Sequence, residues 1–284
     1  MAATIIDGKK IADKIKRSVK RDVENIRNKH KVILRLVALQ IGSNATSEIY
    51  SNAQMKLARE LGIEYNLKTL PEDISQKEAE DEIVKLNNDS AITGIVILTP
   101  TPKHIDIRRL FAKIHPDKDA EGLNPINIGR LIYGDWLVAP CTASACLALI
   151  DSTGINLFGK EVVIVGHSEI VGKPLSLMLL SRMATTTVCH IGTYRKGLLK
   201  SHIERAEVLV VSVGKSHLIK GNWLRKGAIV IDVGINRYEG KVTGDVDFKE
   251  AVKRASYITP VPGGVGPVTA VMLMKNLVAL RGHP

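Results

Sequence analysis

Aromatic residues and cysteines are both scarce in this chain. Phe, Trp and Tyr make up 4% of the 284 residues, and no aromatic cluster lies beside basic residues. Because proteins that bind single-stranded nucleic acid stack bases on aromatic rings, this composition argues against nucleic-acid binding. The three cysteines, Cys141, Cys146 and Cys189, include no CxxC pair and cannot all form disulfides. They indicate a reducing compartment and no metal site, although Cys141 could line a site from its Pro-Cys-Thr turn.

Long apolar runs are also missing. No apolar run reaches the roughly 18 residues that a membrane-spanning helix needs. The first eight residues, MAATIIDG, do not form a basic region followed by an apolar one, as an export signal would. We therefore expect a cytoplasmic protein that does not associate with a membrane.

Acidic residues are outnumbered by basic ones. The chain has 40 Lys and Arg against 29 Asp and Glu, a net charge of +11, and its 45% hydrophobic content is that of a globular protein of one or two domains. The charge favours acidic partners such as an anionic cofactor or a polyanionic substrate tail. Because the basic residues are scattered, a solvated basic surface explains them equally well.

The first half of the chain alternates between helical and strand patterns. Apolar residues recur every three or four positions between Ile11 and Ile26, which predicts an amphipathic helix. The alternation then continues, with strands expected at 32–40, 63–67 and 94–98 and helices at about 48–61 and 75–87. This order indicates a parallel sheet with helices on both faces.

The second half contains four short runs rich in β-branched residues. They follow a helix that ends at Gly154, and they predict strands at 162–165, 185–189, 208–213 and 229–233. A final helix at about 268–280 is expected to pack on the first half. The sequence thus predicts an α/β protein of two domains with a cleft between them, the second domain being a Rossmann-like, doubly wound sheet.

A glycine turn follows the first strand of this second sheet. Residues Gly166–Pro174 (GHSEIVGKP) open a helix, where backbone N–H groups and the helix dipole could bind a pyrophosphate. The glycines lack GxGxxG spacing, so an ordinary strand-to-helix turn is an alternative. Later strands also end in glycine turns, at Gly214 and Gly234. Since the carboxyl ends of parallel strands form the ligand crevice, these turns together favour a dinucleotide site.

Three motifs carry a resemblance to a known family. Ile258–Pro267 (ITPVPGGVGP), Gly166–Pro174 and Asp232–Asn236 (DVGIN) all resemble the methylenetetrahydrofolate dehydrogenase/methenyltetrahydrofolate cyclohydrolase family, and the likeness covers essentially the whole chain. The resemblance implies a folate-binding catalytic domain at 1–140 plus 268–284 and an NAD(P)-binding domain at 141–267. It also implies a folate substrate, no metal and a homodimer.

The resemblance further implies a set of cofactor-binding residues. They are Gly166, His167, Ser168, Ile170, Val171, His190, Thr193, Gly214, Gly234 and Ile235. Family members usually hold the 2′-phosphate of NADP with an arginine and a serine, where this chain has His167 and Ile191. We therefore expect weaker discrimination in favour of NADP, with NAD as the alternative cofactor. In favour of NADP, no acidic residue follows the strand at 185–189, whereas Arg195 and Lys196 could reach a phosphate.

The segment at 42–56 resembles the family's active-site helix, in which a Tyr-x-x-x-Lys pair faces the pterin. Tyr50 fits, but Gln54 replaces the lysine, and an amide cannot shuttle protons. Leu98 replaces the glutamine partner of that lysine, and Glu121 replaces the aspartate that binds the pterin edge. The resemblance thus gives four catalytic positions, Tyr50, Gln54, Leu98 and Glu121. It gives five substrate-binding positions, Tyr50, Glu121, Pro262, Gly263 and Gly264.

These replacements should affect the two family reactions unequally. Hydride transfer needs mainly orientation of substrate and cofactor. Hydrolysis of the cationic product needs proton transfers, which a positioned acid or base accelerates by about 10²–10⁴. We therefore expect an NAD(P)-dependent 5,10-methylenetetrahydrofolate dehydrogenase with weak or absent cyclohydrolase activity. The alternatives are a full bifunctional enzyme with a rearranged proton path and a catalytically silent dinucleotide-binding homologue.

Overall fold

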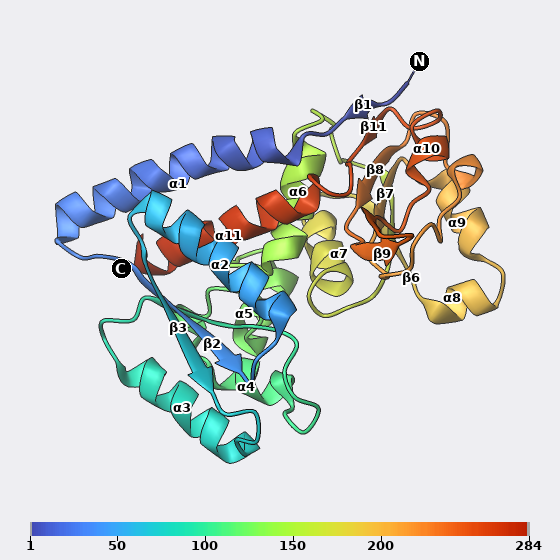
Figure 1. Ribbon diagram of the computed structural model, residues 1–284. Coiled ribbons are helices and arrows are strands. Elements are labelled where there is room, and N and C mark those ends of the chain that lie inside the picture. The colour runs from blue at the N-terminus through green and yellow to red at the C-terminus, as the bar shows by residue number, and fades with distance from the viewer. Residues whose placement is uncertain (1, 283–284) are drawn as a thin grey trace. The chain divides into compact units, whose positions relative to one another are not determined.

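The computed structural model describes residues 2–282, which divide into two compact units (Figure 1). The first unit comprises Lys14–Cys141 with Ala270–Pro284, and the second comprises Met1–Asp13 with Thr142–Thr269. Each unit is built on a parallel sheet, as the sequence predicts. Met1, His283 and Pro284, which the expected domain boundaries include, lie outside the described residues.

The sheet of the first unit has three parallel strands in the order β3-β2-β4. These are β2 (Arg35–Ile41), β3 (Glu64–Leu70) and β4 (Gly94–Ile97), close to the expected positions. The central strand β2 pairs with β3 on one side and with β4 on the other. Six of its seven residues are buried, as expected for a central strand covered on both faces.

Helices α2 (Ala45–Leu61) and α3 (Gln76–Asn88) follow β2 and β3. Ser75 caps α3: its hydroxyl accepts the Glu78 N–H, and the Glu78 carboxylate accepts the Ser75 N–H. The sequence prediction missed three shorter elements, α4 (Ile107–Lys113), the 3₁₀ helix Pro116–Lys118 and α5 (Pro125–Tyr133). Helices α3 and α4 pack with β2 and β4 around one apolar core.

The sheet of the second unit has six parallel strands in the order β1-β11-β8-β7-β5-β6. Four are the expected ones, β5 (Glu161–Val165), β6 (Thr185–Cys189), β7 (Val208–Val211) and β8 (Ile229–Asp232). The other two, β1 (Thr4–Ile5) and β11 (Tyr257–Ile258), are only two residues long, too short for a periodic pattern.

Several helices and one hairpin complete the second unit. The helices are α6 (Cys141–Asp151), α7 (Gly172–Leu180), α8 (Ile191–Arg195), α9 (Leu199–Arg205), the 3₁₀ helix Gly221–Trp223 and α10 (Phe248–Ala251). Strands β9 (Asn236–Tyr238) and β10 (Lys241–Thr243) form the antiparallel hairpin. The alternation of strands and helices gives the doubly wound arrangement that the sequence predicts.

The amino-terminal segment differs from the prediction. We expected residues 1–13 in the first domain, but β1 pairs with β11, so that Thr4 lies opposite Tyr257, and Ala3 enters the core of the second unit. The two later boundaries, after Cys141 and after Thr269, lie within two residues of the expected ones. The expected cleft between the domains stays a prediction.

Two long helices begin in the second unit and continue into the first. They are α1 (Gly8–His30) and α11 (Val265–Gly282). Asn276 of α11 is buried, and its Nδ2 donates to the carbonyl oxygens of Ala120 at 3.0 Å and Ala139 at 2.9 Å. These bonds attach the end of the chain to the first unit. Within residues 2–282, no helix is both long and apolar enough to cross a membrane.

Replacing Asn276 by alanine tests this attachment. Asn276→Ala should lower the free energy of unfolding by about 2–3 kcal/mol, because it leaves two buried carbonyl groups without their donor and opens a small cavity. Urea denaturation measures the change. The exposed neighbour provides the control, since Lys275→Ala should change stability by less than about 0.5 kcal/mol. Equal effects of the two substitutions would contradict the assignment.

Candidate functional site

The predicted cofactor residues lie at one edge of the second unit's sheet. Strands β8, β7, β5 and β6 are neighbours and run parallel, so their carboxyl ends meet at the same edge. Residues 166–171 follow β5, residues 190–193 follow β6, Gly214 follows β7, and residues 234–235 follow β8. All ten predicted positions therefore belong to loops or helix starts at the edge where α/β proteins bind ligands.

Two positions in the turn after β5 can be occupied only by glycine. Gly166 has φ +124°, and a Cβ atom there would lie 2.2 Å from the Ser212 carbonyl oxygen. A Cβ atom on Gly172 would lie 2.0 Å from the Gly166 carbonyl oxygen. The turn is thus a close-packed cradle at the start of α7, with His167 and Ser168 exposed around it. Such a cradle suits the phosphate groups of a dinucleotide.

The loops after β5 and β6 meet through two histidines. The rings of His167 and His190 lie with their centroids 5.3 Å apart. His190 also caps α8. Its ring Nδ1 accepts the backbone N–H of Gly192 at 3.1 Å, and its backbone N–H donates to Thr193 Oγ1 at 3.3 Å. Ile191, at the position where family members are expected to have serine, is 58% exposed and offers no polar group.

Two buried aspartates, Asp232 and Asp245, support the remaining loops, although neither was predicted as a site residue. Asp245 accepts the backbone N–H groups of Val213, Gly214 and Lys215 at 2.7–3.0 Å. Asp232 accepts those of Gly234, Asp245 and Val246 at 2.9–3.0 Å. Burial raises the pKa of Asp232 to about 6, against the lowering effect of the N–H groups that it accepts. The available signal was the DVGIN motif, which contains Asp232, and the segment Gly244–Phe248 (GDVDF), which contains Asp245 and also resembles the family.

In the first unit, Tyr50 and Gln54 lie on α2 as predicted. Tyr50 is half exposed, whereas Gln54 is partly buried and its Oε1 accepts a hydrogen bond from Tyr65 Oη at 3.0 Å. Ser51 Oγ lies 3.1 Å from the same Tyr65 oxygen. Burial raises the pKa of Tyr65, partly offset by the Ser51 hydrogen bond. Tyr65 was not predicted as a site residue, because its place in an alternating strand pattern marks it only as a half-buried strand residue.

Leu98 and Glu121 lie on or beside β4. Leu98 directly follows the strand and is buried, so this position carries no polar side chain. The segment at 119–122 runs along β4, since Ala120 N–H donates to the Ile95 carbonyl oxygen. Glu121 keeps some exposed surface, but desolvation and, secondarily, the charge of Asp119 raise its pKa to about 7. The Glu121 carboxyl can therefore exchange a proton near neutral pH.

Asp119 and Cys141 form the buried surroundings of Glu121. Asp119 is 1% exposed and accepts the N–H groups of Gly122 and Asn124 at 2.9 and 2.7 Å and the Asn127 amide at 3.0 Å. Burial, with the nearby Glu121 and Asp119 carboxylates, raises the pKa of the Cys141 thiol well above its usual value. The thiol is therefore a structural group. The described residues contain no cluster of three or more His, Cys, Asp or Glu side chains suited to a metal ion.

The proline-glycine loop belongs to the second unit. Gly263 has φ +103°, and a Cβ atom on Gly8 would lie 1.8 Å from the Gly264 carbonyl oxygen, so the start of α1 packs directly on the loop. The expected role of Pro262, Gly263 and Gly264 beside the substrate stays a prediction.

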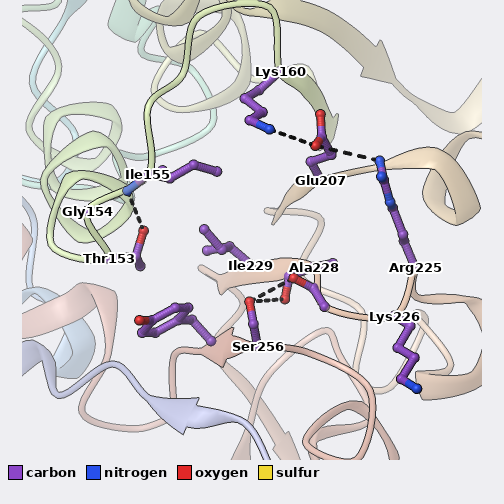
Figure 2. Close-up of a pocket in the computed structure, with 12 residues that line it drawn as sticks. Thr153, Gly154, Ile155, Lys160, Glu207, Arg225, Lys226, Ala228, Ile229 and Ser256 are labelled. Carbon is purple, nitrogen blue, oxygen red and sulfur yellow. Dashed lines mark hydrogen bonds and ion pairs between the residues drawn. The ribbon is translucent and has the colours of Figure 1, made fainter.

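A cavity of about 360 Å³ lies at the opposite edge of the second unit's sheet (Figure 2). Ile229 and Tyr257, the first residues of β8 and β11, line it. Glu207 at its wall forms ion pairs with Lys160 at 3.0 Å and Arg225 at 3.8 Å. None of the predicted site residues lines this cavity, and parallel α/β sheets bind ligands at the other edge. It is therefore not the candidate cofactor site.

Family models match both halves of the chain. Residues 6–121 match the tetrahydrofolate dehydrogenase/cyclohydrolase catalytic domain, and residues 140–282 match the NAD(P)-binding domain of the same family. The chain belongs to the tetrahydrofolate dehydrogenase/cyclohydrolase family. The predictions of this family, of a two-domain α/β fold and of an NAD(P)-binding domain are confirmed.

Individual family members extend the match over the whole chain. The bifunctional protein FolD of Nitratiruptor is 43% identical over 274 residues, which cover 96% of each chain. The crystal structure of the FolD dehydrogenase/cyclohydrolase of Campylobacter jejuni superposes with a TM-score of 0.94 at 39% identity and covers 99% of both chains. The Trypanosoma brucei enzyme, solved with NADP and an inhibitor, gives a TM-score of 0.93 at 35% identity, covering 99% of this chain and 98% of that one.

The raised pKa of Glu121 predicts a pH dependence of stability. Folding raises this pKa from 4.5 to about 7, so the stabilisation from protonated Glu121 is fully present below pH 4.5 and is lost as the pH rises through 7. Between pH 5 and pH 8 the protein should therefore lose roughly 2–3 kcal/mol relative to Glu121→Gln, whose side chain does not titrate. Denaturant unfolding at both pH values measures this difference. Glu24→Gln, at an exposed position of α1, should have the same dependence of stability on pH as the wild-type protein. If Glu121→Gln also had the wild-type dependence, the raised pKa of Glu121 would be contradicted.

Proposed function

We propose that the protein oxidises 5,10-methylenetetrahydrofolate with NAD(P) and hydrolyses the methenyl product. The whole-chain likeness to relatives that are named as bifunctional supports both activities together. This likeness is the observation that carries the hydrolase half, and Glu121, whose carboxyl pKa is raised to about 7 by burial, offers a group that can exchange a proton. This proposal favours the alternative from the sequence analysis, a bifunctional enzyme with a rearranged proton path, over a dehydrogenase alone.

The oxidation step needs orientation more than acid-base chemistry. When bound, the nicotinamide cofactor accepts the hydride that leaves the methylene carbon of the substrate. The glycine cradle at Gly166 and Gly172 would hold its phosphates, and the exposed ring of Tyr50 would pack on the pterin. The product cation is stabilised by the lone pairs of the adjacent nitrogens, so the replacement of lysine by Gln54 leaves this step intact.

The hydrolysis step needs a group that moves protons. Water adds to the methenyl carbon and loses a proton, which gives a carbinol. One carbon–nitrogen bond then breaks, and the freed nitrogen takes up the carbinol proton. The product is the formyl compound. Gln54 cannot exchange a proton, and Leu98 has no polar atom. Glu121 has the pKa that suits a general base at neutral pH and would accept the proton from water.

A dehydrogenase without hydrolase activity is the second candidate, favoured by Gln54 and Leu98 at two catalytic positions. Purified protein mixed with the substrate and each cofactor separates the candidates. Reduced cofactor with decay of the methenyl absorbance supports the bifunctional enzyme, whereas reduced cofactor with a stable methenyl absorbance supports the second candidate. Absence of turnover would instead indicate the catalytically silent homologue.

Homodimeric assembly and a cytoplasmic location also belong to the proposal. Light scattering tests the assembly, and cell fractionation tests the location.

Substituting Glu121 separates its role in proton transfer from its role in binding. Glu121→Gln should lower the rate of methenyl hydrolysis by about 10²-fold, because glutamine keeps the polar shape but not the base. Oxidation should fall less than tenfold. Both rates are followed by absorbance with the same preparations. An equal loss in the two reactions would assign Glu121 to substrate binding alone.

The cofactor preference depends on the residue that follows Gly166. His167 is exposed beside the cradle, and an arginine there would add a permanent charge and bidentate hydrogen bonds to a 2′-phosphate. His167→Arg should raise the ratio of kcat/KM for NADP over NAD by about tenfold. His30→Arg at the end of α1 is the matched control and should leave the ratio unchanged. A ratio that does not respond to His167→Arg would remove this position from the cofactor site.

A further inference from the structure

The cavity at the amino ends of the second unit's strands has a place in the fold that the proposed function does not use. Its lining comes from the segments that lead into four neighbouring strands, β5, β7, β8 and β11, and from the turn that follows α6. Its volume of about 360 Å³ is at the small end of ligand sites, which measure roughly 300–1,000 Å³. The cavity therefore suits a small organic molecule rather than a dinucleotide.

Positive charge predominates in the lining. Three lining residues are basic, Lys160, Arg225 and Lys226, and one is acidic, Glu207, which leaves a surplus of two positive charges. Figure 2 shows Lys160, Glu207 and Arg225 in one row, joined by their two ion pairs. The hydrogen bond from Lys160 lowers the pKa of Glu207, so that this carboxylate is ionised at neutral pH. The row is thus a fixed group of charges that favours an anion.

The carboxylate of Glu207 does not use all the donors around it. The Lys160 ammonium has three N–H donors, and among the described residues it donates to Glu207 alone. The Arg225 guanidinium has five, and only its Nη1 has acceptors in the described residues, the Arg205 carbonyl oxygen at 3.4 Å and Glu207 at 3.8 Å. Its Nε and Nη2 groups are therefore available, and guanidinium groups bind phosphate oxygens in this way.

The turn that carries Arg225 is fixed by its own hydrogen bonds. The Ala228 N–H donates to the Arg225 carbonyl oxygen at 3.1 Å, and Gly227 between them has φ +83°, a backbone conformation that favours glycine. The Ser256 hydroxyl donates to the Gly227 carbonyl oxygen at 2.7 Å. Because this turn is ordered without a ligand, binding there costs little conformational entropy.

An apolar surface completes the lining. It is formed by Ile155, the buried Ile229 and the partly buried Tyr257. A free inorganic ion would leave this surface uncovered, and a single carboxylate would match only half of the charge surplus. A phosphomonoester carries about −1.5 to −2 at pH 7, and its organic group can cover the apolar surface.

We propose that this cavity binds a small organic phosphomonoester. The phosphate lies against Lys160 and Arg225, with Lys226 adding to the positive field, and the organic group packs on Ile229 and Tyr257. No bond is made or broken in this step. The site is separate from the glycine cradle at the other edge of the sheet, and it does not depend on the proposed folate reactions.

Calorimetric titration with phenyl phosphate tests the proposal. One molecule should bind per chain with a Kd of about 1 mM or lower, as expected for a ligand of this size. Inorganic phosphate, which lacks the ring, and benzoate, which has one charge, should each bind at least fivefold more weakly. Arg225→Gln and Lys160→Gln should each weaken the binding of phenyl phosphate by tenfold or more. The matched control is Arg237→Gln, at an exposed arginine of β9 outside the cavity, which should change the Kd less than twofold.

The glycine cradle is a competing site for the same probe, so the titration is repeated with excess NADP. Unchanged binding is expected, and displacement by NADP would assign the probe to the cradle and overturn the proposal. Equal affinities for phenyl phosphate and benzoate would overturn the phosphate class. Binding that does not respond to Arg225→Gln or to Lys160→Gln, or no binding at all, would overturn the site. Should one of these variants not fold, the other decides, and neither result bears on turnover of the folate substrate.

Discussion

Buried aspartates accept backbone N–H groups from the loops that carry both candidate sites. In the second unit, Asp245 accepts three consecutive N–H groups after β7, and Asp232 accepts three more after β8 and in the segment that precedes α10. In the first unit, Asp119 accepts N–H groups from the turn that contains Glu121. A carboxylate that accepts several N–H groups fixes a loop without a regular ladder of hydrogen bonds, and the geometry of both sites depends on this.

The same carboxylates determine the electrostatics of the sites. Asp119 lies close enough to Glu121 to disfavour a second negative charge there, in addition to the effect of desolvation. The group that fixes the turn thus also adds to the effect of desolvation on the pKa of its neighbour Glu121. For the proposed hydrolysis, the raised pKa of Glu121 offers a proton acceptor in place of Gln54, whose amide cannot exchange a proton.

The sequence predicts the long elements and the position of the cofactor loops. Strand β6 lies at its expected bounds, and α3 begins one residue after the capping serine at position 75. The elements and site residues that the sequence does not predict depend on contacts between residues that are distant along the chain. Strands β1 and β11 are defined only by pairing with each other and with β8, and Tyr65 becomes part of the α2 site only because β3 packs beneath that helix.

The pairing of β1 with β11 has a consequence for the order of folding. The two strands are separated by about 250 residues of sequence, and Asn276 joins the first unit from still further along the chain. During synthesis on the ribosome, neither unit can therefore acquire all of its native contacts until the residues beyond 257 have been made. Contacts of such long range slow folding and expose unpaired strand edges, so the nascent protein should depend on protection from aggregation longer than its modest length alone would suggest.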